Sequence, residues 1–315
     1  MWGYFFLING LSLLFMLSLD SESVKNFLME NLISLLILFS FPHFMVTYWI
    51  WFKRVQDWRR EWLPIIFPIL YVAFFLSIFY FKPTFIDIST LIKLSYCYLL
   101  YHFAQQLYGS NLWLNHSLKV SFSNFEKYGF RALALMSAFY ALTMLEMSGA
   151  ASSLFYHRAA HWNFSASFIS GLFYVVLVLF LILTSLRIKN FMKNRELKQL
   201  YPFMGYIICF IWFFPPSLHG LALFLPIVHA LQYSPFVFMK LKDSTKIKLA
   251  ATFAISISAG YFFFRWIPFQ DLGEALPTTI WAPLVLTTLN NHHFVIDGRI
   301  WKLGDPQNKD LRIKI

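Results

Sequence analysis

The chain is organised as apolar blocks of roughly twenty residues, each separated from the next by a short polar or charged stretch. A helix needs about 20 apolar residues to cross the hydrocarbon core of a bilayer, because each residue advances it by about 1.5 Å. The pattern predicts membrane-spanning helices at residues 2–19, 31–52, 62–81, 88–108, 129–148, 164–186, 202–217, 218–240, 248–267 and 277–296. Pro215 and Pro216 predict a tight turn between the seventh and eighth of these spans.

Composition leads to the same class of protein. Hydrophobic residues occupy 58% of the 315 positions and charged residues only 13%, whereas soluble domains carry roughly 25% charged residues. This excludes a soluble enzyme, a disordered chain and a collagen-like fibre. We expect an all-α polytopic membrane bundle of about ten transmembrane helices, with one helical domain at 1–298 and a short basic tail at 299–315. No Lys or Arg precedes the first apolar block and no small-residue cleavage site follows it, so we interpret this block as a retained helix.

Basic residues are concentrated in every second loop. They follow the second, sixth and eighth spans, lie between the fourth and fifth, and close the chain, whereas the intervening loops are acidic or only weakly basic. By the positive-inside rule, this alternation predicts an even number of spans with both termini in the cytoplasm. The net charge of +11 therefore reflects topology. We expect no nucleic-acid partner, because the basic residues do not gather on one amphipathic face.

Five of the nine histidines lie inside apolar spans, namely His43, His102, His229, His292 and His293. Counted from the outer end of each span, all five lie roughly 17–23 Å deep in a hydrocarbon core about 30 Å thick. The four helices that carry them run in the same direction under the predicted topology. Histidines that bond only to a neighbouring helix have no reason to share one depth. We therefore expect these side chains to converge on one intramembrane site.

A polar residue lies one helical turn beyond four of the candidate ligands, His43, His102, His229 and His293. The polar residues are Thr47, Gln106, Gln232, Tyr233 and Asp297, three or four positions after a histidine of the same span. Residues at that spacing share a helix face, and polar partners of this kind fix the tautomer and orientation of metal-bound imidazoles. We expect Gln106, Gln232 and Asp297 to orient the histidines, and Tyr233 to donate a proton or hydrogen bond beside an open metal position.

Several neutral imidazoles with few carboxylates suit iron, copper or zinc and do not suit calcium or magnesium. We favour iron; zinc would point instead to hydrolysis by an activated water. A proton relay needs carboxylates within the spans, and only Glu146 and Asp297 qualify, both near span ends. Haem with two axial imidazoles leaves the other histidines unexplained. Because His292 and His293 diverge by about 100° on a helix, we expect one to be a ligand and the other a supporting or proton-handling group.

The remaining polar candidates are weaker. His116 is predicted in a cytoplasmic loop and His219 at the start of the eighth span, while His157 and His161 form an H-x-x-x-H spacing in an outer loop. A loop pair without a third ligand is typical of solvated surface, so these histidines are left outside the predicted site. The two cysteines both lie inside apolar blocks, which favours neither a disulfide nor a metal motif.

Three motifs resemble those of a family of uncharacterised bacterial polytopic membrane proteins. They are His-Phe-x-x-Gln-x-Tyr-Gly at 102–109, His-x-x-Gln-Tyr at 229–233 and His-His-Phe-x-x-Asp-Gly-x-Ile-Trp-Lys at 292–302. With His43 they extend over most of the chain. The resemblance implies a many-helix fold in the bacterial inner (cytoplasmic) membrane and supports the predicted site, but it implies no particular reaction.

By architecture alone, the chain is also similar to histidine-rich membrane oxygenases such as fatty-acyl desaturases, sterol hydroxylases and the bacterial carotene-cleaving enzymes. Desaturases carry H-x-x-x-H and H-x-x-H-H boxes, usually in cytosolic segments. Here the histidines are mostly single and lie within the predicted spans. This difference argues against a desaturase-type di-iron centre.

The first functional hypothesis is a metal-dependent membrane oxidoreductase, of the oxygenase, hydroxylase or desaturase kind, that acts on a lipid-soluble substrate such as a fatty acyl chain, an isoprenoid or a quinone. An apolar substrate can reach an intramembrane site from the bilayer without crossing water. The expected partners are the lipid bilayer, this substrate and an electron donor. One alternative is a transporter or channel with the histidines as transit ligands, which predicts polar residues at several depths. The other is an assembly factor whose histidines bond only to neighbouring helices.

Overall fold

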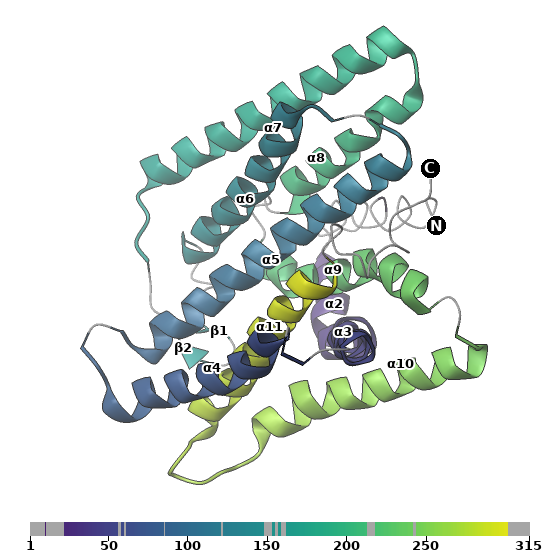
Figure 1. The fold of residues 1–315 in the computed structure, drawn as a ribbon. Helices are drawn as coiled ribbons and strands as arrows, with labels where there is room; N and C mark the ends of the chain where they lie inside the picture. The colour runs from purple at the N-terminus through teal and green to yellow at the C-terminus, as the bar shows by residue number, and fades with distance from the viewer. Residues whose placement is uncertain are drawn as a thin grey trace.

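The computed structural model describes residues 10, 22–55, 58–59, 61–84, 86–120, 122–147, 153–154, 157–158, 162–212, 218–241 and 244–301. Helices make up almost all of this part of the chain (Figure 1). In order, the elements are α2 (Glu22–Leu35), the π-helical turn η1 (Leu36–Ser40), α3 (Phe41–Arg54), α4 (Trp62–Phe81), α5 (Ile88–Ser117), α6 (Asn124–Met147), α7 (Ala166–Asn194), the 3₁₀ turn η3 (Leu197–Leu200), α8 (Tyr201–Trp212), α9 (Leu218–Leu241), α10 (Lys246–Tyr261), the π turn η4 (Phe262–Trp266), the 3₁₀ turn η5 (Ile267–Phe269) and α11 (Thr278–Ile300). Two short antiparallel strands, β1 (Ser153–Leu154) and β2 (His157–Arg158), lie between α6 and α7.

Helix ends follow from capping residues in the sequence. α6 begins with a capping box, in which Ser123 Oγ accepts the N–H of Glu126 at 3.2 Å and the Glu126 carboxylate accepts the N–H of Ser123 at 3.0 Å. At the start of α7, the Ser165 side chain accepts the N–H of Phe168 at 3.2 Å. α7 stops where Arg195 adopts a left-handed conformation with φ of 55°. Because these caps set the helix ends, α6 begins before, and α7 ends after, the apolar blocks that predicted them.

A π-helical turn precedes each of two prolines. Proline has no N–H and its ring crowds the carbonyl four residues earlier, so regular α-helical bonding cannot continue through it. Before Pro42, the N–H of Phe41 bonds instead to the carbonyl of Leu36, and η1 joins α2 and α3 into one continuous helix. η4, at the end of α10, is the corresponding π-helical turn before Pro268. The expected span at 31–52 is therefore part of a longer helix that begins at Glu22 and ends at Arg54.

α11 lies centrally and packs against α3, α4 and α5 (Figure 1). On the other side of α5, a core of buried apolar side chains joins α5 to α6, α7 and α8. Two fully buried ion pairs strengthen this region, Lys93 with Glu146 between α5 and α6, and Arg187 with Glu126 between α7 and α6. The packing of α11 and α9 beside α3 and α5 positions the site described below.

α10 and α3 approach each other closely at Gly260. A Cβ atom at this position would lie 2.7 Å from the Cβ of Phe41 and 3.0 Å from its backbone carbonyl carbon. The rings of Phe41 and Phe264 stack nearby, with centroids 4.8 Å apart. A small residue at the crossing point lets two helix backbones come together, as is common between membrane helices.

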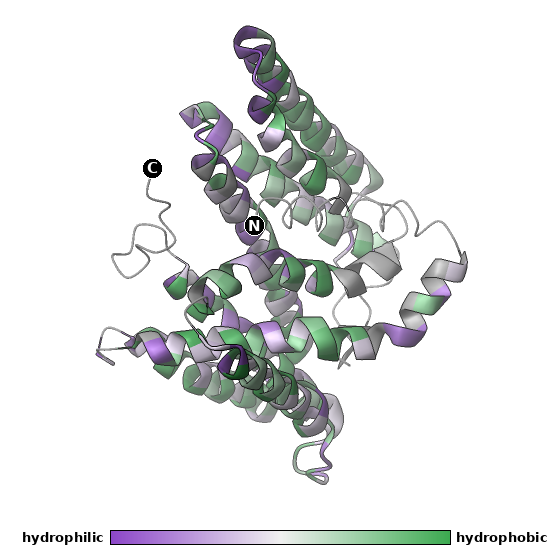
Figure 2. Cartoon of the chain, turned by 90° about the vertical axis from the view of Figure 1, so that its right-hand side faces the viewer, coloured by the Kyte–Doolittle hydropathy of each residue, from purple (hydrophilic) through white to green (hydrophobic). Residues whose placement is uncertain are grey.

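Four helical segments in the described chain are long and apolar enough to cross a membrane, namely α4, α6, α7 and Lys246–Phe269. Hydrophobic residues (green) recur along the helices in Figure 2, and α4, α7 and α10 expose large apolar side chains. This indicates a membrane protein and confirms the all-helical class. α11 is less apolar because several of its buried side chains are polar, among them Asn290, Asn291, His293 and Asp297.

Each predicted span after the first overlaps a helix, but ten membrane crossings and two cytoplasmic termini stay predictions. The helices do not share one direction, since in Figure 1 α3 is seen nearly end-on whereas α7 and α10 lie across the view. α11 continues to Ile300, so the predicted tail at 299–315 begins inside a helix. The span at 2–19 (apart from Gly10), the Pro215-Pro216 turn and the tail beyond Trp301 lie outside the described residues.

Candidate metal centre

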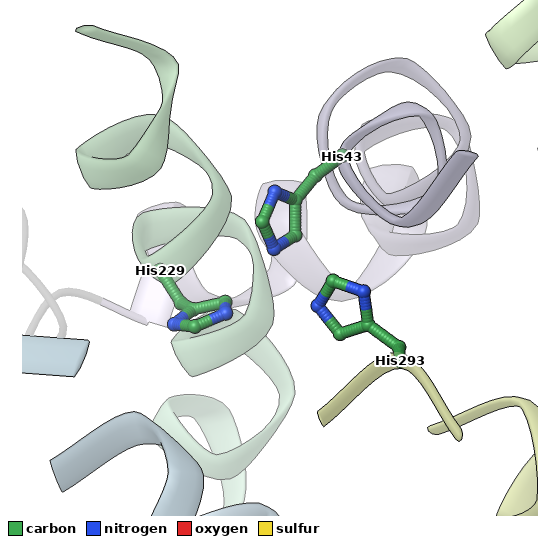
Figure 3. Close-up of side chains that lie close together, drawn as sticks. All are labelled: His43, His229 and His293. Carbon is green, nitrogen blue, oxygen red and sulfur yellow. The ribbon is translucent and has the colours of Figure 1, made fainter. Parts of the chain in front are cut away.

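Four buried histidines meet where α3, α5, α9 and α11 come together. His43 lies on α3, His102 on α5, His229 on α9 and His293 on α11. The ring centroids of His43 lie 5.1 Å from His229 and 4.9 Å from His293, and those of His102 lie 5.1 Å from His229 and 5.6 Å from His293. Figure 3 shows three of the rings turned toward a common space. The structure thus brings together four of the five histidines that the sequence analysis placed inside apolar spans.

Local helix geometry and aromatic packing hold these rings in place. One extra residue per turn changes the phase of a helix by about 100°, so η1 sets which face of α3 carries His43. Phe294 stacks on the ring of His102 with centroids 4.1 Å apart, and Phe103 packs against His229 at 4.4 Å. Rings held by packing offer a preorganised set of nitrogen ligands.

The potential ligand atoms form two overlapping groups. Nitrogens of His43, His229 and His293 all lie within 4.8 Å of one another, and so do nitrogens of His102 and His293 with a carboxylate oxygen of Asp297. His102 Nε2 and His293 Nε2 are each 3.4 Å from Asp297 Oδ2. Because His293 belongs to both groups, four imidazoles and one carboxylate surround one small region.

Six imidazole nitrogens of this cluster are buried and have no hydrogen-bond partner in the described part of the chain. They are both ring nitrogens of His43 and of His293, together with Nε2 of His102 and of His229. More than about 90% of buried polar groups in proteins are paired, and an unpaired one costs about 1–3 kcal/mol. Convergent unpaired imidazoles are what a transition metal ion requires, so the residues present fit a bound metal.

Asp297 is held by donors from two helices. Tyr233 Oη on α9 and Trp301 Nε1 at the end of α11 each donate to Asp297 Oδ1 at 3.1 Å. Thr47 Oγ1 on α3 lies 3.3 Å from Tyr233 Oη. With Oδ1 occupied by two donors, Oδ2 is the oxygen that approaches His102 and His293. The carboxylate is therefore fixed toward the cluster.

Two other residues one turn beyond a histidine, Gln106 and Thr47, donate hydrogen bonds to backbone carbonyls and not to histidine rings. Gln106 Nε2 donates to the backbone carbonyl of His229 at 3.2 Å, across to α9, and not to His102 on its own helix. Thr47 Oγ1 donates to the backbone carbonyl of His43 at 3.1 Å. Gln232 is buried on α9. Among the residues expected to orient a histidine of their own helix, Asp297 comes near a ring, with Oδ2 3.4 Å from His293 Nε2, whereas Gln106 and Thr47 bond to backbone carbonyls.

His292 lies apart from the cluster. Its Nε2 is 2.7 Å from the backbone carbonyl of Pro64, which can only accept, so Nε2 carries the proton. Its Nδ1 then accepts from the hydroxyl of Tyr48 at 2.9 Å. Both ring nitrogens are therefore used in tying α11 to α4 and α3. The structure places His292 as a packing residue, whereas the sequence analysis included it among the candidate metal ligands.

A cavity of about 440 Å³ lies between α5, α9 and α11, beside the cluster. Its polar lining consists of His102, Gln105, Gln106, Ser110, Tyr233 and Asp297. His102 and Asp297 therefore belong both to the cavity wall and to the candidate metal centre, whereas His43, His229 and His293 lie behind that wall. A volume of this size is typical of small-molecule sites, and catalytic metal centres keep one side open to their substrate.

Sequence reasoning missed several contributors. Trp301 holds Asp297 and was noted only as part of a motif, although its position four residues after Asp297 signals a shared helix face. Glu146, the other carboxylate considered for a relay, instead pairs with Lys93 and accepts the N–H of Trp162 at 3.0 Å. A lysine inside an apolar block was the available signal for that pair.

The structure describes the side chain of His116 among the remaining histidines, and it lies outside the cluster. His116 lies exposed in the last turn of α5, not in a loop as predicted. His157 begins β2. The side chains of His157 and His219, and the whole of His161, lie outside the described structure.

Comparisons with protein-family models, with curated proteins and with solved structures give no match to this chain. The resemblance carried by the three sequence motifs accordingly stays a proposal. What the chain can do is argued from its own fold and site, which are those of a membrane protein with a buried histidine cluster that could hold a metal ion.

Proposed function

We propose that the protein is an integral metalloenzyme of the bacterial inner membrane, which uses molecular oxygen to oxidise a lipid-soluble substrate. The observation that carries this proposal is the set of six buried imidazole nitrogens that make no hydrogen bond within the described chain, beside a cavity whose wall includes His102 and Asp297. A metal site alone would suit many functions. A metal site that borders a ligand-sized cavity favours chemistry on a bound molecule.

In this proposal His43, His102, His229 and His293 hold the metal and Asp297 completes the set. Imidazoles with one carboxylate suit iron best among the metals that react with oxygen, with copper and zinc as alternatives. A bound iron or copper ion supplies the one-electron chemistry that oxygen activation requires. The buried Asp297 carboxylate partly offsets the positive charge of that ion in a region with little solvent.

Residues of the cavity wall take the remaining roles. Tyr233 borders the cavity and donates to Asp297, so its hydroxyl can hold a proton between the carboxylate and a bound substrate. If one oxygen atom of O₂ enters the substrate, two electrons and two protons must reduce the other atom to water. An electron donor at the membrane surface would supply those electrons. The substrate itself arrives from the lipid bilayer.

The alternatives fit these observations less well. A transporter or channel needs ligands at successive depths, but the intramembrane histidines in the described chain lie in one cluster, with His292 bonded elsewhere. An assembly factor needs histidines that bond to neighbouring helices. Of the five, only His292 shows that arrangement at both ring nitrogens.

Oxygen uptake by protein reconstituted in lipid nanodiscs tests the proposal. Iron-loaded protein supplied with a lipid extract and a chemical reductant should consume oxygen, and His229→Ala should abolish this. His116→Ala, on the exposed end of α5, is the matched control and should retain it. If metal-loaded protein consumes no oxygen but carries the metal across liposome membranes, the transporter hypothesis would replace the enzyme hypothesis. Equal uptake by His229→Ala would place the reaction elsewhere.

A further inference from the structure

The cavity follows one face of α5 over several turns. Its lining residues on this helix recur every three to four positions from Tyr98 to Trp113. That spacing places them on one stripe of the helix, and fifteen residues at about 1.5 Å each give a length of about 22 Å. The wall is therefore elongated, and His102 lies nearer the Tyr98 end than the Trp113 end.

The apolar part of the lining is aromatic throughout. It consists of Tyr98, Tyr101, Trp113, Phe236, Phe294 and Trp301, and none of the lining residues has an aliphatic side chain. The rings form two groups, with Tyr98 against Phe294 at 5.3 Å near one end and Trp113 against Phe236 at 4.8 Å near the other. Rings prefer to stack or meet edge-on with other planar π-systems. The wall therefore suits a planar, unsaturated ligand better than a flexible saturated chain.

Charge in the lining argues against an anionic ligand. No Lys or Arg side chain lines the cavity, and its one carboxylate, Asp297, is directed at the histidines. Arg131 lies outside the lining, where its Nε donates to Gln105 Oε1 at 3.1 Å. Gln105 Nε2 and Gln106 Oε1 have no hydrogen-bond partner in the described chain. The wall thus offers amide hydrogen-bonding capacity and no counter-charge for a carboxylate or a phosphate.

Two glycines enlarge the cavity. Gly109 on α5 and Gly298 on α11 both line it, and a Cβ atom at either position would meet no atom within 4 Å. Glycine costs a helix about 1 kcal/mol relative to alanine, and neither glycine is required here by a close helix contact. Their effect in this position is to leave open space at two points of the cavity wall.

We propose that this cavity binds the ring of an uncharged phenol or quinol lipid, with the ring between the aromatic walls and a hydroxyl group near His102. The proposal rests on the proposed function, because it names the substrate class of the same site. Gln105, Gln106 and Ser110 bind further hydroxyl or carbonyl groups of the ligand. The alkyl part of the ligand leaves the ring toward the bilayer.

Direct binding to the purified full-length protein in detergent tests this proposal. Decylhydroquinone is the probe, and decanoate, with a chain of matched length but an anionic head, is the comparison. Binding is measured by isothermal titration calorimetry. Gly109→Leu fills the cavity from α5, and Gly298→Leu fills it from α11 if the first variant fails to fold. Gly171→Leu is the matched control, because Gly171 is an exposed helical glycine of α7 with equally open space.

Saturable binding of decylhydroquinone that Gly109→Leu weakens at least about tenfold, and Gly171→Leu leaves unchanged, supports the proposal. Decanoate should show no saturable binding. Decanoate binding as tightly as decylhydroquinone, or full decylhydroquinone binding by both cavity-filling variants, overturns it. Metal content is measured on the same samples. Protein that retains its metal but does not bind decylhydroquinone would show that the proposed substrate class is wrong while the metal centre is correct.

Discussion

Asp297→Asn tests the electrostatic part of the metal centre without removing its shape. Asparagine keeps an oxygen that can accept from Tyr233 and Trp301, so the local packing should survive. What disappears is the negative charge that lies 3.4 Å from both His102 Nε2 and His293 Nε2. This residue is only 5% exposed, so solvent screens that charge poorly.

Changing a residue that supports a metal ligand typically lowers metal affinity by about 10–100-fold, which corresponds to about 1.4–2.7 kcal/mol. We expect at least that loss for Asp297→Asn, because the carboxylate is also close enough to be a ligand. Competition with a coloured chelator of known affinity, on detergent-purified protein, measures it. Trp301→Phe removes one donor to Asp297 and keeps the charge, so it should have a smaller effect. Unchanged affinity in Asp297→Asn would refute the role given to this carboxylate.

Three further predictions concern stability and the limits of the site. Glu146→Leu leaves Lys93 buried without its carboxylate and should lower the free energy of unfolding by about 3–5 kcal/mol. Combining it with Lys93→Met should recover most of that loss. Denaturation in detergent measures both variants. Gly260→Ala should destabilise the protein by about 1–3 kcal/mol through overpacking, while Gly171→Ala should stabilise it by about 0.5–1 kcal/mol. His292→Ala should keep full metal content by elemental analysis, because both of its ring nitrogens are bonded elsewhere.

Each of these has a definite contrary result. A double variant as unstable as Glu146→Leu alone would show that the cost does not come from an unpaired lysine. A Gly260→Ala protein as stable as wild type would contradict the close approach of α10 to α3. Loss of metal from His292→Ala would place that histidine in the centre after all.

Much of the helical architecture could be predicted because long apolar blocks leave the backbone few alternatives in a membrane. The block at 62–81 matches α4 residue for residue. The histidines were grouped by their expected depth along parallel spans, and that depth stays a prediction, since the helices do not share one direction in Figure 1. Four of the five histidines chosen by depth do meet in space.

What failed depended on helix rotation and on neighbours. Depth alone cannot separate His292 from His293, because adjacent residues face different directions and only packing decides which direction faces the cluster. Gln106 bonds across to α9, a contact that its spacing from His102 could not reveal. The π turn before Pro42 changes the phase of α3, and no hydrophobic pattern marks it. The stripe from Tyr98 to Trp113 is visible in the sequence, but its meaning requires knowing that α9 and α11 enclose it.

The most direct test of the account is the metal content of protein purified in mild detergent without chelator or metal-affinity tag. His293 belongs to both ligand groups and His229 to one, so a His229→Ala, His293→Ala double variant removes the centre, while His292→Ala serves as a partly buried control on the same helix as His293. The account predicts near-stoichiometric iron or copper in the wild type and in His292→Ala, and none in the folded double variant. A folded wild-type protein that binds no metal would contradict it.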